Sequence, residues 1–378
     1  MASSYDFQEF DDVEIVVSRA TDGVGYTAHI RLLDFEAVSN KLRPLPFQDL
    51  ERASDPLTVG EQLFQWLFRD EVGEVFSYAR KLASEPTRGF KSGTRLRLRL
   101  SLDPQSAELR RLCWESLYTP DGMLPFSLTT AFSRFIRISG PRGGPLRDRP
   151  LRMLLAISNP ESIDRSTLNE VAPDLEKSII KDATRQLRSL LKLERLQGPS
   201  TLARIQATVE KGYHIVHLLA PAVFHDEQGY LVLPDDTGQA KEIPFEAIVR
   251  AIVSPSHPPP GLVFLAVPLT AREQGGGTLV GLAQMLIKAG VHALVAIQPP
   301  ISASDLLRFI ERFYAALMRT GMIDVAVREA RTEIYRPDNW EWTYPVLYMC
   351  VPDGRLFQPL SEMLENEITG IGVGRIGL

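Results

Sequence analysis

Thiol-dependent chemistry in this chain would draw on two cysteines as nucleophiles and six histidines as bases. A thiol attacks a carbonyl carbon well only as a thiolate, so a cysteine-dependent site needs a histidine within about 3 Å to take the proton. The residues are Cys113, Cys350, His29, His214, His217, His225, His257 and His292. The cysteines are far apart in the sequence and the histidines are scattered, so we expect neither a disulfide framework nor a metal site.

One of these histidines stands where a catalytic group could lie. The segment YHIVHLLAPA (213–222) is an apolar strand that contains His217 and then turns at Pro221. We expect His217 to be structural and to bond a neighbouring loop, with His214 facing the opposite side of the strand. His225 falls in the hairpin that follows.

The two cysteines are expected to be packing residues. Cys350 lies in the apolar segment YPVLYMCV (344–351), where a buried thiol behaves as a small hydrophobic group. Cys113 precedes Trp114 and is expected to pack beside it.

Composition argues against nucleic acid and membrane partners. The 42 basic and 47 acidic residues give a net charge of -5, which does not indicate a phosphate-binding surface. The longest apolar region, 279–297, is interrupted by Gln284, Lys288, Gly290 and His292, so we expect no membrane span. The acidic N-terminus does not resemble a signal peptide, and we expect a cytoplasmic protein.

The first 140 residues are expected to form a β-rich α/β subdomain. Period-two alternation on both sides of Asp22-Gly23 predicts a hairpin over 12–33, and apolar residues at three- and four-residue steps predict a helix over 59–83. In RLRLRLSL (95–102) leucines alternate with arginines, which favours a strand with one buried face and one solvated face over an anion site. The Gly-, Pro- and Arg-rich residues 141–150 are the expected linker.

Residues 151–360 alternate strands with helices, which predicts a mostly parallel sheet covered on both faces. The expected strands are 151–158, 213–219, 261–267, 291–297 and 344–351, with a hairpin through 230–233, and the expected helices are 175–196, 201–211, 244–253, 278–289, 304–319 and 323–334. Ser302 and Asp305 form a capping pattern before the helix over 304–319. Residues 361–378 are expected to be a C-terminal tail, which is either a frayed end or a segment that docks on a partner.

A glycine-rich stretch, EQGGGTLVGLAQ (273–284), follows a strand and opens a helix. A phosphate-binding loop of the Walker type would also need a lysine after its glycines, and none is present. We therefore expect no nucleotide and no other cofactor.

Two longer segments, 96–122 and 289–331, carry a resemblance to a known family. LRLRLSLDPQSAELRRLCWESLYTPDG and AGVHALVAIQPPISASDLLRFIERFYAALMRTGMIDVAVREAR resemble the CHAT domain, a caspase-like peptidase module related to separase. The resemblance runs from about residue 12 to residue 357. It implies a caspase-like α/β fold with a mostly parallel sheet flanked by helices, and a Cys/His dyad at the carboxyl ends of two neighbouring strands.

The same resemblance implies that the dyad is absent. The strand motif His-Phe-x-Gly-His-Gly, aligned on His217, places the catalytic histidine at Pro221 and its flanking glycines at Ala220 and Ala222. The motif Leu-Asn-Ala-Cys places the nucleophile at Pro268. Proline can neither exchange a proton nor attack a carbonyl, and it removes a backbone N–H that could stabilise an oxyanion.

We therefore expect a catalytically inactive pseudo-peptidase that binds another protein as a regulator, inhibitor or scaffold. The family context implies a bacterial defence pathway, with an active caspase-like protease, its substrate or a sensor as the partner. Two alternatives stay open: an active peptidase that uses His217 or His225 with Cys350 or a threonine, and a small-ligand sensor that uses the vacated pocket.

Overall fold

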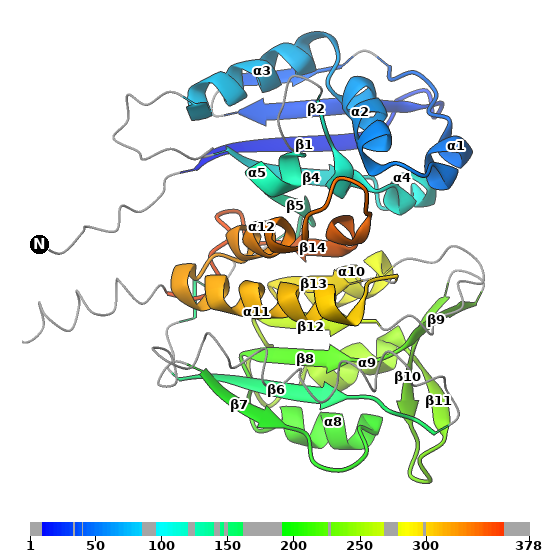
Figure 1. Ribbon diagram of the computed structural model, residues 1–378, viewed down its shortest axis with the longest axis vertical. Helices are drawn as coiled ribbons and strands as arrows, with labels where there is room; N and C mark the ends of the chain where they lie inside the picture. Colours follow the sequence, from blue (N-terminus) through cyan, green and yellow to red (C-terminus); the bar gives the residue numbers. More distant parts are fainter. Residues whose placement is uncertain are drawn as a thin grey trace, which may run out of the picture.

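A single long sheet forms the centre of the protein (Figure 1). The computed structural model describes residues 10–32, 35–39, 41–84, 96–119, 125–139, 144–146, 150–161, 191–225, 228–267, 279–297 and 300–358. Its strands are β1 (Asp11–Arg19), β2 (Tyr26–Leu32), β3 (Phe35–Val38), β4 (Leu96–Leu102), β5 (Ala131–Phe135), β6 (Leu151–Ile157), β7 (Leu191–Arg195), β8 (Ile215–Leu219), β9 (Ala222–His225), β10 (Gln228–Pro234), β11 (Ala240–Pro244), β12 (Leu262–Ala266), β13 (Ala293–Ile297) and β14 (Pro345–Met349).

The main sheet has 11 strands in the order β3-β2-β1-β4-β5-β14-β13-β12-β8-β6-β7. Antiparallel pairing is confined to β1–β2, β2–β3 and β13–β14 among the described strands of this sheet, and the other neighbours run parallel. The predicted α/β class with a mostly parallel sheet is confirmed, as are the antiparallel edge and the turn at Asp22-Gly23.

Helices cover the sheet on both faces. They are α1 (Phe47–Arg52), α2 (Pro56–Leu67), α3 (Asp70–Ser84), α4 (Ala107–Arg111), α5 (Phe126–Thr129), α8 (Leu202–Val209), α9 (Phe245–Ile252), α10 (Val280–Lys288), α11 (Ala303–Thr320) and α12 (Ile323–Ile334), with short 3-10 helices at Trp114–Ser116 and Glu341–Thr343. Helices α11 and α12 pack on one face of the C-terminal strands, and α8, α9 and α10 pack on the other. Helices α2 and α3 cover the N-terminal strands.

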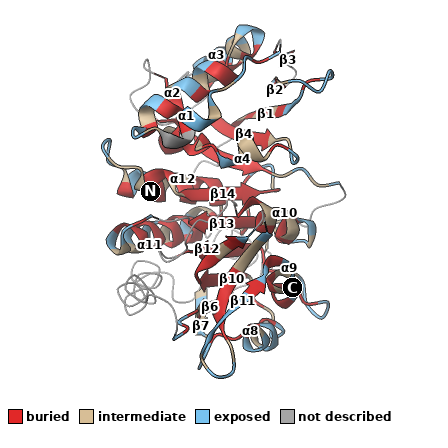
Figure 2. Cartoon of the chain, turned by 90° about the vertical axis from the view of Figure 1, so that its right-hand side faces the viewer, coloured by how far each residue is buried: buried red, intermediate tan, exposed pale blue. Residues whose placement is uncertain are grey.

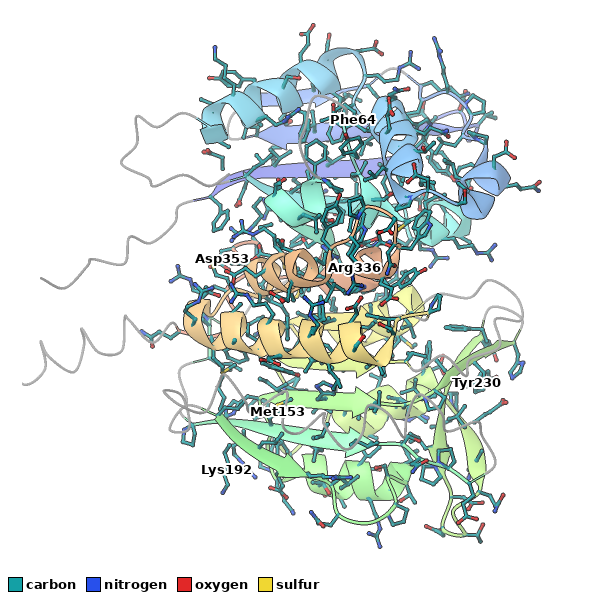
Figure 3. All side chains as sticks on the ribbon, in the orientation of Figure 1. Phe64, Met153, Lys192, Tyr230, Arg336 and Asp353 are labelled. Atoms are coloured by element: carbon teal, nitrogen blue, oxygen red, sulfur yellow. The ribbon has the colours of Figure 1, made fainter. Side chains whose placement is uncertain are left out.

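Figure 2 colours the buried residues, which lie along the strands and on the helices that cover them. Figure 3 draws the side chains and labels the half-buried Phe64 of α2 and the fully buried Met153 of β6. Among the described residues the core forms three clusters, one on each face of the C-terminal strands and one beneath α2 and α3.

Helix α11 begins and ends where the sequence predicts. The Ser302 side chain accepts a hydrogen bond from the backbone N–H of Asp305, which satisfies one of the free N–H groups of the first turn. Gly321 ends the helix in the left-handed conformation, with φ of 69°, which costs glycine little. The predicted capping pattern is confirmed.

Strand β4 corrects one expectation, because its arginine face is not solvated. The Arg97 side chain is 4% exposed and forms ion pairs with Asp324 of α12 and Asp12 of β1. Burial opposes the charge on Arg97, but the two carboxylates outweigh this cost and raise its pKa. Arg99 is 13% exposed and also lies near Asp12. The alternation marked a buried ionic contact that holds α12 against β4.

A second buried ionic group joins the two halves of the sheet at β5 and β14. Arg134 of β5 donates hydrogen bonds to both carboxylate oxygens of Glu115. Arg331 of α12 lies 3.9 Å from the same carboxylate and donates to the backbone carbonyl of Pro345. Burial lowers the pKa of Arg331 to about 10.

Two expected elements differ from the structure. The helix expected over 59–83 is two helices, because the chain breaks after Leu67 and Asp70 adopts φ of 50°. The helix expected over 175–196 is wrong at 191–195, where strand β7 pairs in parallel with β6; residues 175–190 lie outside the described residues. The hairpin through 230–233 is confirmed, since β9 pairs antiparallel with β10, and β11 adds a third strand to this small sheet.

The predicted boundary at 141–150 stays a prediction. The main sheet passes from β5 to β14 without interruption. Within the expected linker, the N–H of Leu146 donates to the carbonyl of Leu356, and the N–H of Gln358 donates back to Leu146. The first described residues of this segment are therefore tied to the end of the described chain.

Candidate functional site

The carboxyl ends of β6, β8, β12 and β13 meet at one edge of the sheet. Backbone hydrogen bonds hold the residues just beyond these strands. The N–H of Ser158 donates to the carbonyl of Leu219, that of Ala220 to the carbonyl of Ala266, and that of Val267 to the carbonyl of Ile297. Open α/β sheets commonly bind ligands at this edge. We refer to it below as the carboxyl edge.

Pro221 lies at the carboxyl edge, between β8 and β9. Its carbonyl accepts a hydrogen bond of 2.8 Å from the N–H of Val232, so it links the main sheet to the three-stranded sheet. The Ser158 hydroxyl donates to the carbonyl of the same Val232 at 2.7 Å. Ala220 and Ala222 on either side are 1% exposed. The proline is thus fixed within a packed junction.

Pro268 follows Val267 immediately but lies outside the described residues. So does most of the glycine-rich stretch, up to residue 278. The structure therefore places one of the two predicted dyad positions.

His217 lies in the core beneath helix α11. Its ring stacks on Phe264 with centroids 4.4 Å apart, and its Nδ1 shares a 2.9 Å hydrogen bond with the Tyr314 hydroxyl. Burial lowers the pKa of His217 to about 3 and raises that of Tyr314, so both side chains are neutral near pH 7. The expected loop partner was wrong, because the partner is a helix residue. A neutral, fully buried imidazole cannot receive a proton from a solvent-exposed substrate.

His225 has a different environment. It is exposed on β9, and its Nε2 lies 3.0 Å from a carboxylate oxygen of Glu242 on β11. His225 is thus exposed and next to a carboxylate, whereas His217 is buried and neutral. The two histidines that the displaced-residue alternative offers as the base therefore have different environments.

Cys350 lies at the opposite edge of the sheet. Strand β14 runs antiparallel to β13, so the residue after Met349 is next to His292, before β13 begins. The thiol donates to the backbone carbonyl of His292 at 3.5 Å and is 1% exposed. Cys350 also belongs to the core cluster on one face of the sheet, whereas Phe264, on which His217 stacks, belongs to the cluster on the other face. Cys350 is therefore remote from both Pro221 and His217.

Cys113 is also poorly placed for nucleophilic attack. Burial, together with the nearby Glu115 carboxylate, raises its pKa to about 11. Such a thiol is protonated at neutral pH, and thiols in that state are weak nucleophiles.

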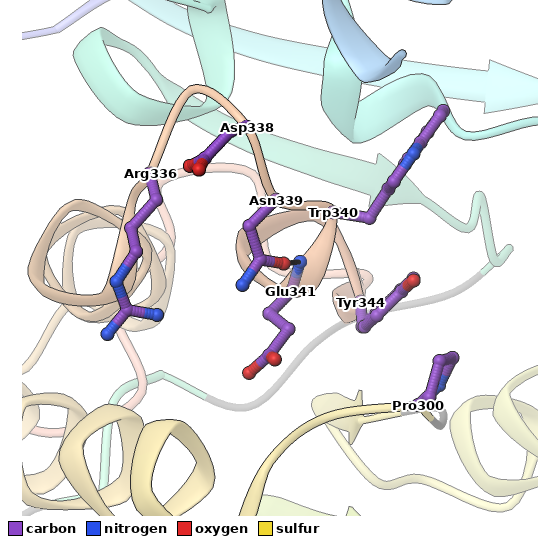
Figure 4. A pocket seen from close by; sticks show the side chains of 7 residues that line it. All are labelled: Pro300, Arg336, Asp338, Asn339, Trp340, Glu341 and Tyr344. Carbon is purple, nitrogen blue, oxygen red and sulfur yellow. Dashed lines mark hydrogen bonds between the residues drawn. The ribbon is translucent and has the colours of Figure 1, made fainter. Parts of the chain in front are cut away.

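The structure adds one hollow at the carboxyl edge that sequence reasoning missed. A concavity of about 440 Å³ is lined by Pro300, Arg336, Asp338, Asn339, Trp340, Glu341 and Tyr344 (Figure 4). It lies beside β13 and β14, since Ile297 pairs with Pro345. The segment RPDNWEWTY (336–344), unusually rich in aromatic and charged residues for a loop, was the available signal.

Polar contacts hold the walls of this hollow in place. Glu341 accepts hydrogen bonds from the N–H and hydroxyl of Ser302, and Arg336 pairs with the buried carboxylate of Asp305. The Trp340 indole N–H donates to the carbonyl of Ser54 at 2.9 Å. The carboxyl edge thus presents a shaped surface at β13 and β14, on the far side of β12 from the junction at Pro221.

The described part of the chain has neither a group of side chains that could bind a metal ion nor a helix that could span a membrane. No group of three or more His, Cys, Asp or Glu residues could hold a metal ion there. Within the same residues, no helix has the length and apolar character needed to cross a bilayer.

Comparison with solved structures shows the same fold. A chain in the crystal structure of the Saccharomyces cerevisiae separase–securin complex at 3.0 Å resolution is similar with a TM-score of 0.50 and 9% identity. The match covers 90% of this chain and 30% of that one, so the present chain spans under a third of the length of the matched chain. A structure of the same complex at 2.6 Å has a TM-score of 0.36 and 11% identity, covering 84% and 21% of the two chains.

Comparison at the level of sequence identifies the family. None of the curated proteins matches the chain. The CHAT domain model matches residues 57–362, which includes the carboxyl edge, α11, α12 and β14. This chain belongs to the CHAT domain family.

Proposed function

We propose that this chain is a non-catalytic CHAT-domain protein that binds another protein and does not cleave it. The observation that carries the proposal is Pro221, which stands at the end of β8 where the resemblance expects the catalytic histidine. Its carbonyl is engaged by Val232, and its ring offers no group that exchanges a proton. The sequence at Pro268 supports the same conclusion for the nucleophile.

The remaining candidates for chemistry support it further. His217 is buried and neutral, and Cys350 lies at the other edge of the sheet. A cysteine dyad needs its thiol and imidazole within hydrogen-bond reach of each other. A dyad of Cys350 and His217 would have to bring together groups that the fold holds on opposite faces of the sheet.

Binding remains available to such a protein. The carboxyl edge keeps a hollow with two aromatic walls, Trp340 and Tyr344, and charged groups around it. Aromatic side chains and nearby charges are enriched at protein interfaces. We propose the carboxyl edge as the recognition surface for a partner in a bacterial defence pathway, where the chain acts as a regulator, inhibitor or scaffold.

A site-specific photocrosslinking experiment tests this proposal. A photoreactive amino acid replaces the exposed Asp338 at the carboxyl edge, and in a control it replaces the exposed Lys288 at the amino edge. After irradiation in the native host, the adducts are analysed by intact-mass spectrometry. We expect a partner of full length at position 338 and none at 288.

Two results would contradict the proposal. A crosslinked product that is a fragment of the partner, with a new terminus at the edge, would indicate cleavage. Equal capture at both positions would show that the carboxyl edge is not the recognition surface.

A further inference from the structure

A second concavity lies away from the carboxyl edge, in the N-terminal half. It measures about 550 Å³ and is lined by Phe64, Phe68, Asp70, Gly73, Glu74 and Ser77. Volumes of about 300–1,000 Å³ are typical of ligand-binding pockets. We call it the elbow groove because it lies at the break between α2 and α3; Figure 3 labels Phe64, one of its lining residues.

The base of the elbow groove is aromatic. The rings of Phe64 and Phe68 have centroids 4.7 Å apart, and Phe68 stacks on the buried Phe76 at 3.9 Å. Phe64 also contacts Phe126 at 5.6 Å. Because these rings are anchored in the core, the apolar surface exposed in the groove is rigid, which lowers the entropic cost of binding.

The backbone keeps the groove open. Asp70 begins α3 in the left-handed region, with φ of 50°, so the chain turns sharply between the two helices. At Gly73 a Cβ atom would lie 2.9 Å from the carbonyl oxygen of Phe68. A glycine therefore allows α3 to approach Phe68 closely and adds no side chain to the hollow.

The charge of the elbow groove is one-sided. Its two charged lining residues, Asp70 and Glu74, are both acidic and exposed. Neither carboxylate has a hydrogen-bond or ion-pair partner among the described residues, whereas Glu115, Asp305 and Asp324 are all paired. The same aromatic cluster already has a guanidinium over one ring, since Arg80 lies 5.4 Å from the centroid of Phe126.

We propose that the elbow groove docks an arginine-containing segment of a partner protein. The guanidinium would lie over the partly exposed ring of Phe64 and pair with Asp70 and Glu74, and an apolar neighbour of the arginine would pack beside it. The inference rests on the proposed function for the statement that this chain binds proteins, and it adds the chemistry of one partner segment.

Fluorescence anisotropy with short labelled peptides tests the inference on the full chain. The probes alternate leucine with arginine, with citrulline or with glutamate, since citrulline keeps the shape of arginine without its charge. Asp70→Asn combined with Glu74→Gln removes both charges, and asparagine tolerates the left-handed backbone at position 70. Glu71→Gln is the matched control, because it removes one charge from the same helical turn outside the groove.

We expect the arginine peptide to bind the wild type about tenfold more tightly than the citrulline peptide, a difference of about 1.4 kcal/mol. The double variant should lose this preference, Glu71→Gln should retain it, and added salt should weaken it. Thermal unfolding of the double variant checks that the fold is intact.

Several outcomes would overturn the inference. The first is that the arginine peptide does not bind at about 1 mM, a dissociation constant that corresponds to about -4 kcal/mol. The second is that the citrulline or glutamate peptide binds as tightly as the arginine peptide. The third is that the double variant binds the arginine peptide as tightly as the wild type does. A dimer seen by sedimentation and abolished by the double variant would replace the partner with a second copy of this chain. These outcomes leave the crosslinking test of the carboxyl edge unaffected, so the two proposals can fail separately.

Discussion

The His217 imidazole and the Tyr314 hydroxyl share a 2.9 Å hydrogen bond that ties the middle of strand β8 to helix α11. Both residues are fully buried, at 0% exposure. The histidine that the sequence places nearest the predicted dyad is therefore an anchor between the sheet and its covering helix.

Loss of this bond should destabilise the fold. Tyr314→Phe removes the hydroxyl and leaves Nδ1 of His217 buried without its partner, which costs about 1–3 kcal/mol. Urea unfolding measures the change. Tyr230→Phe, which removes the exposed hydrogen bond to Gln228, is the control and should change stability by less than about 0.5 kcal/mol. Equal stability of wild type and Tyr314→Phe would show that the bond does not anchor the helix.

The same histidine should make stability depend on pH. Its pKa is about 3 in the folded chain against an ordinary value of 6.5, so between these values the unfolded state binds the proton and the folded state does not. Its contribution is fully present above pH 6.5 and decreases as the pH falls toward 3, by at most about 1.4 kcal/mol per pH unit.

Comparison with His217→Asn isolates this contribution, because the carboxylates titrate in both proteins. The free energy of unfolding of the wild type should fall more steeply between pH 6 and pH 4.5 than that of the variant. Parallel pH profiles would mean that His217 takes up its proton in the folded chain.

The buried pair between Arg97 and Asp324 should be worth far more than an exposed pair. Asp324→Asn leaves the Arg97 guanidinium, 4% exposed, without its main counter-charge, and breaking such a pair typically costs about 3–5 kcal/mol. Glu36→Gln breaks the exposed pair with Arg31 and should lower the stability far less, because water and salt screen charges at the surface. Chemical denaturation measures the free energy of unfolding of both variants. Similar losses of stability in the two would contradict the conclusion that the Arg97–Asp324 pair holds α12 against β4.

Both thiols should be inert in the folded protein. Cys350 is 1% exposed and Cys113 has a pKa of about 11, so a thiol reagent at pH 7.5 should label neither within the time that it labels both in urea. Mass spectrometry counts the adducts. Rapid labelling of one cysteine in the native state would identify an activated thiol and would favour the alternative in which the chain is an active peptidase.

Sequence periodicity predicted the elements of the C-terminal half well, because their patterns are simple. Strands such as β12 and β13 are buried on both faces and read as continuous apolar runs, and α11 has a clear cap at Ser302. The pattern failed at β7, an edge strand of alternating apolar and charged residues that also fits a charged helix. It failed at 59–83 because nothing local marks the break before Asp70.

The environment of individual side chains was harder to predict. Arg97 and Arg99 alternate with leucines as solvated residues do, but Arg97 pairs with Asp324, which is more than 200 positions away in the sequence. His217 likewise depends on Tyr314, which lies on a different element. Contacts between distant segments decide burial and charge, and one sequence does not specify them.

Profiling of new protein N-termini shows whether this chain cleaves other proteins. The purified chain is incubated with a denatured proteome, in parallel with a variant that carries both Cys113→Ala and Cys350→Ala, and the termini are compared with buffer alone. We predict identical profiles in all three samples. A reproducible set of cleavages made by the wild type and lost in the double variant would contradict the account.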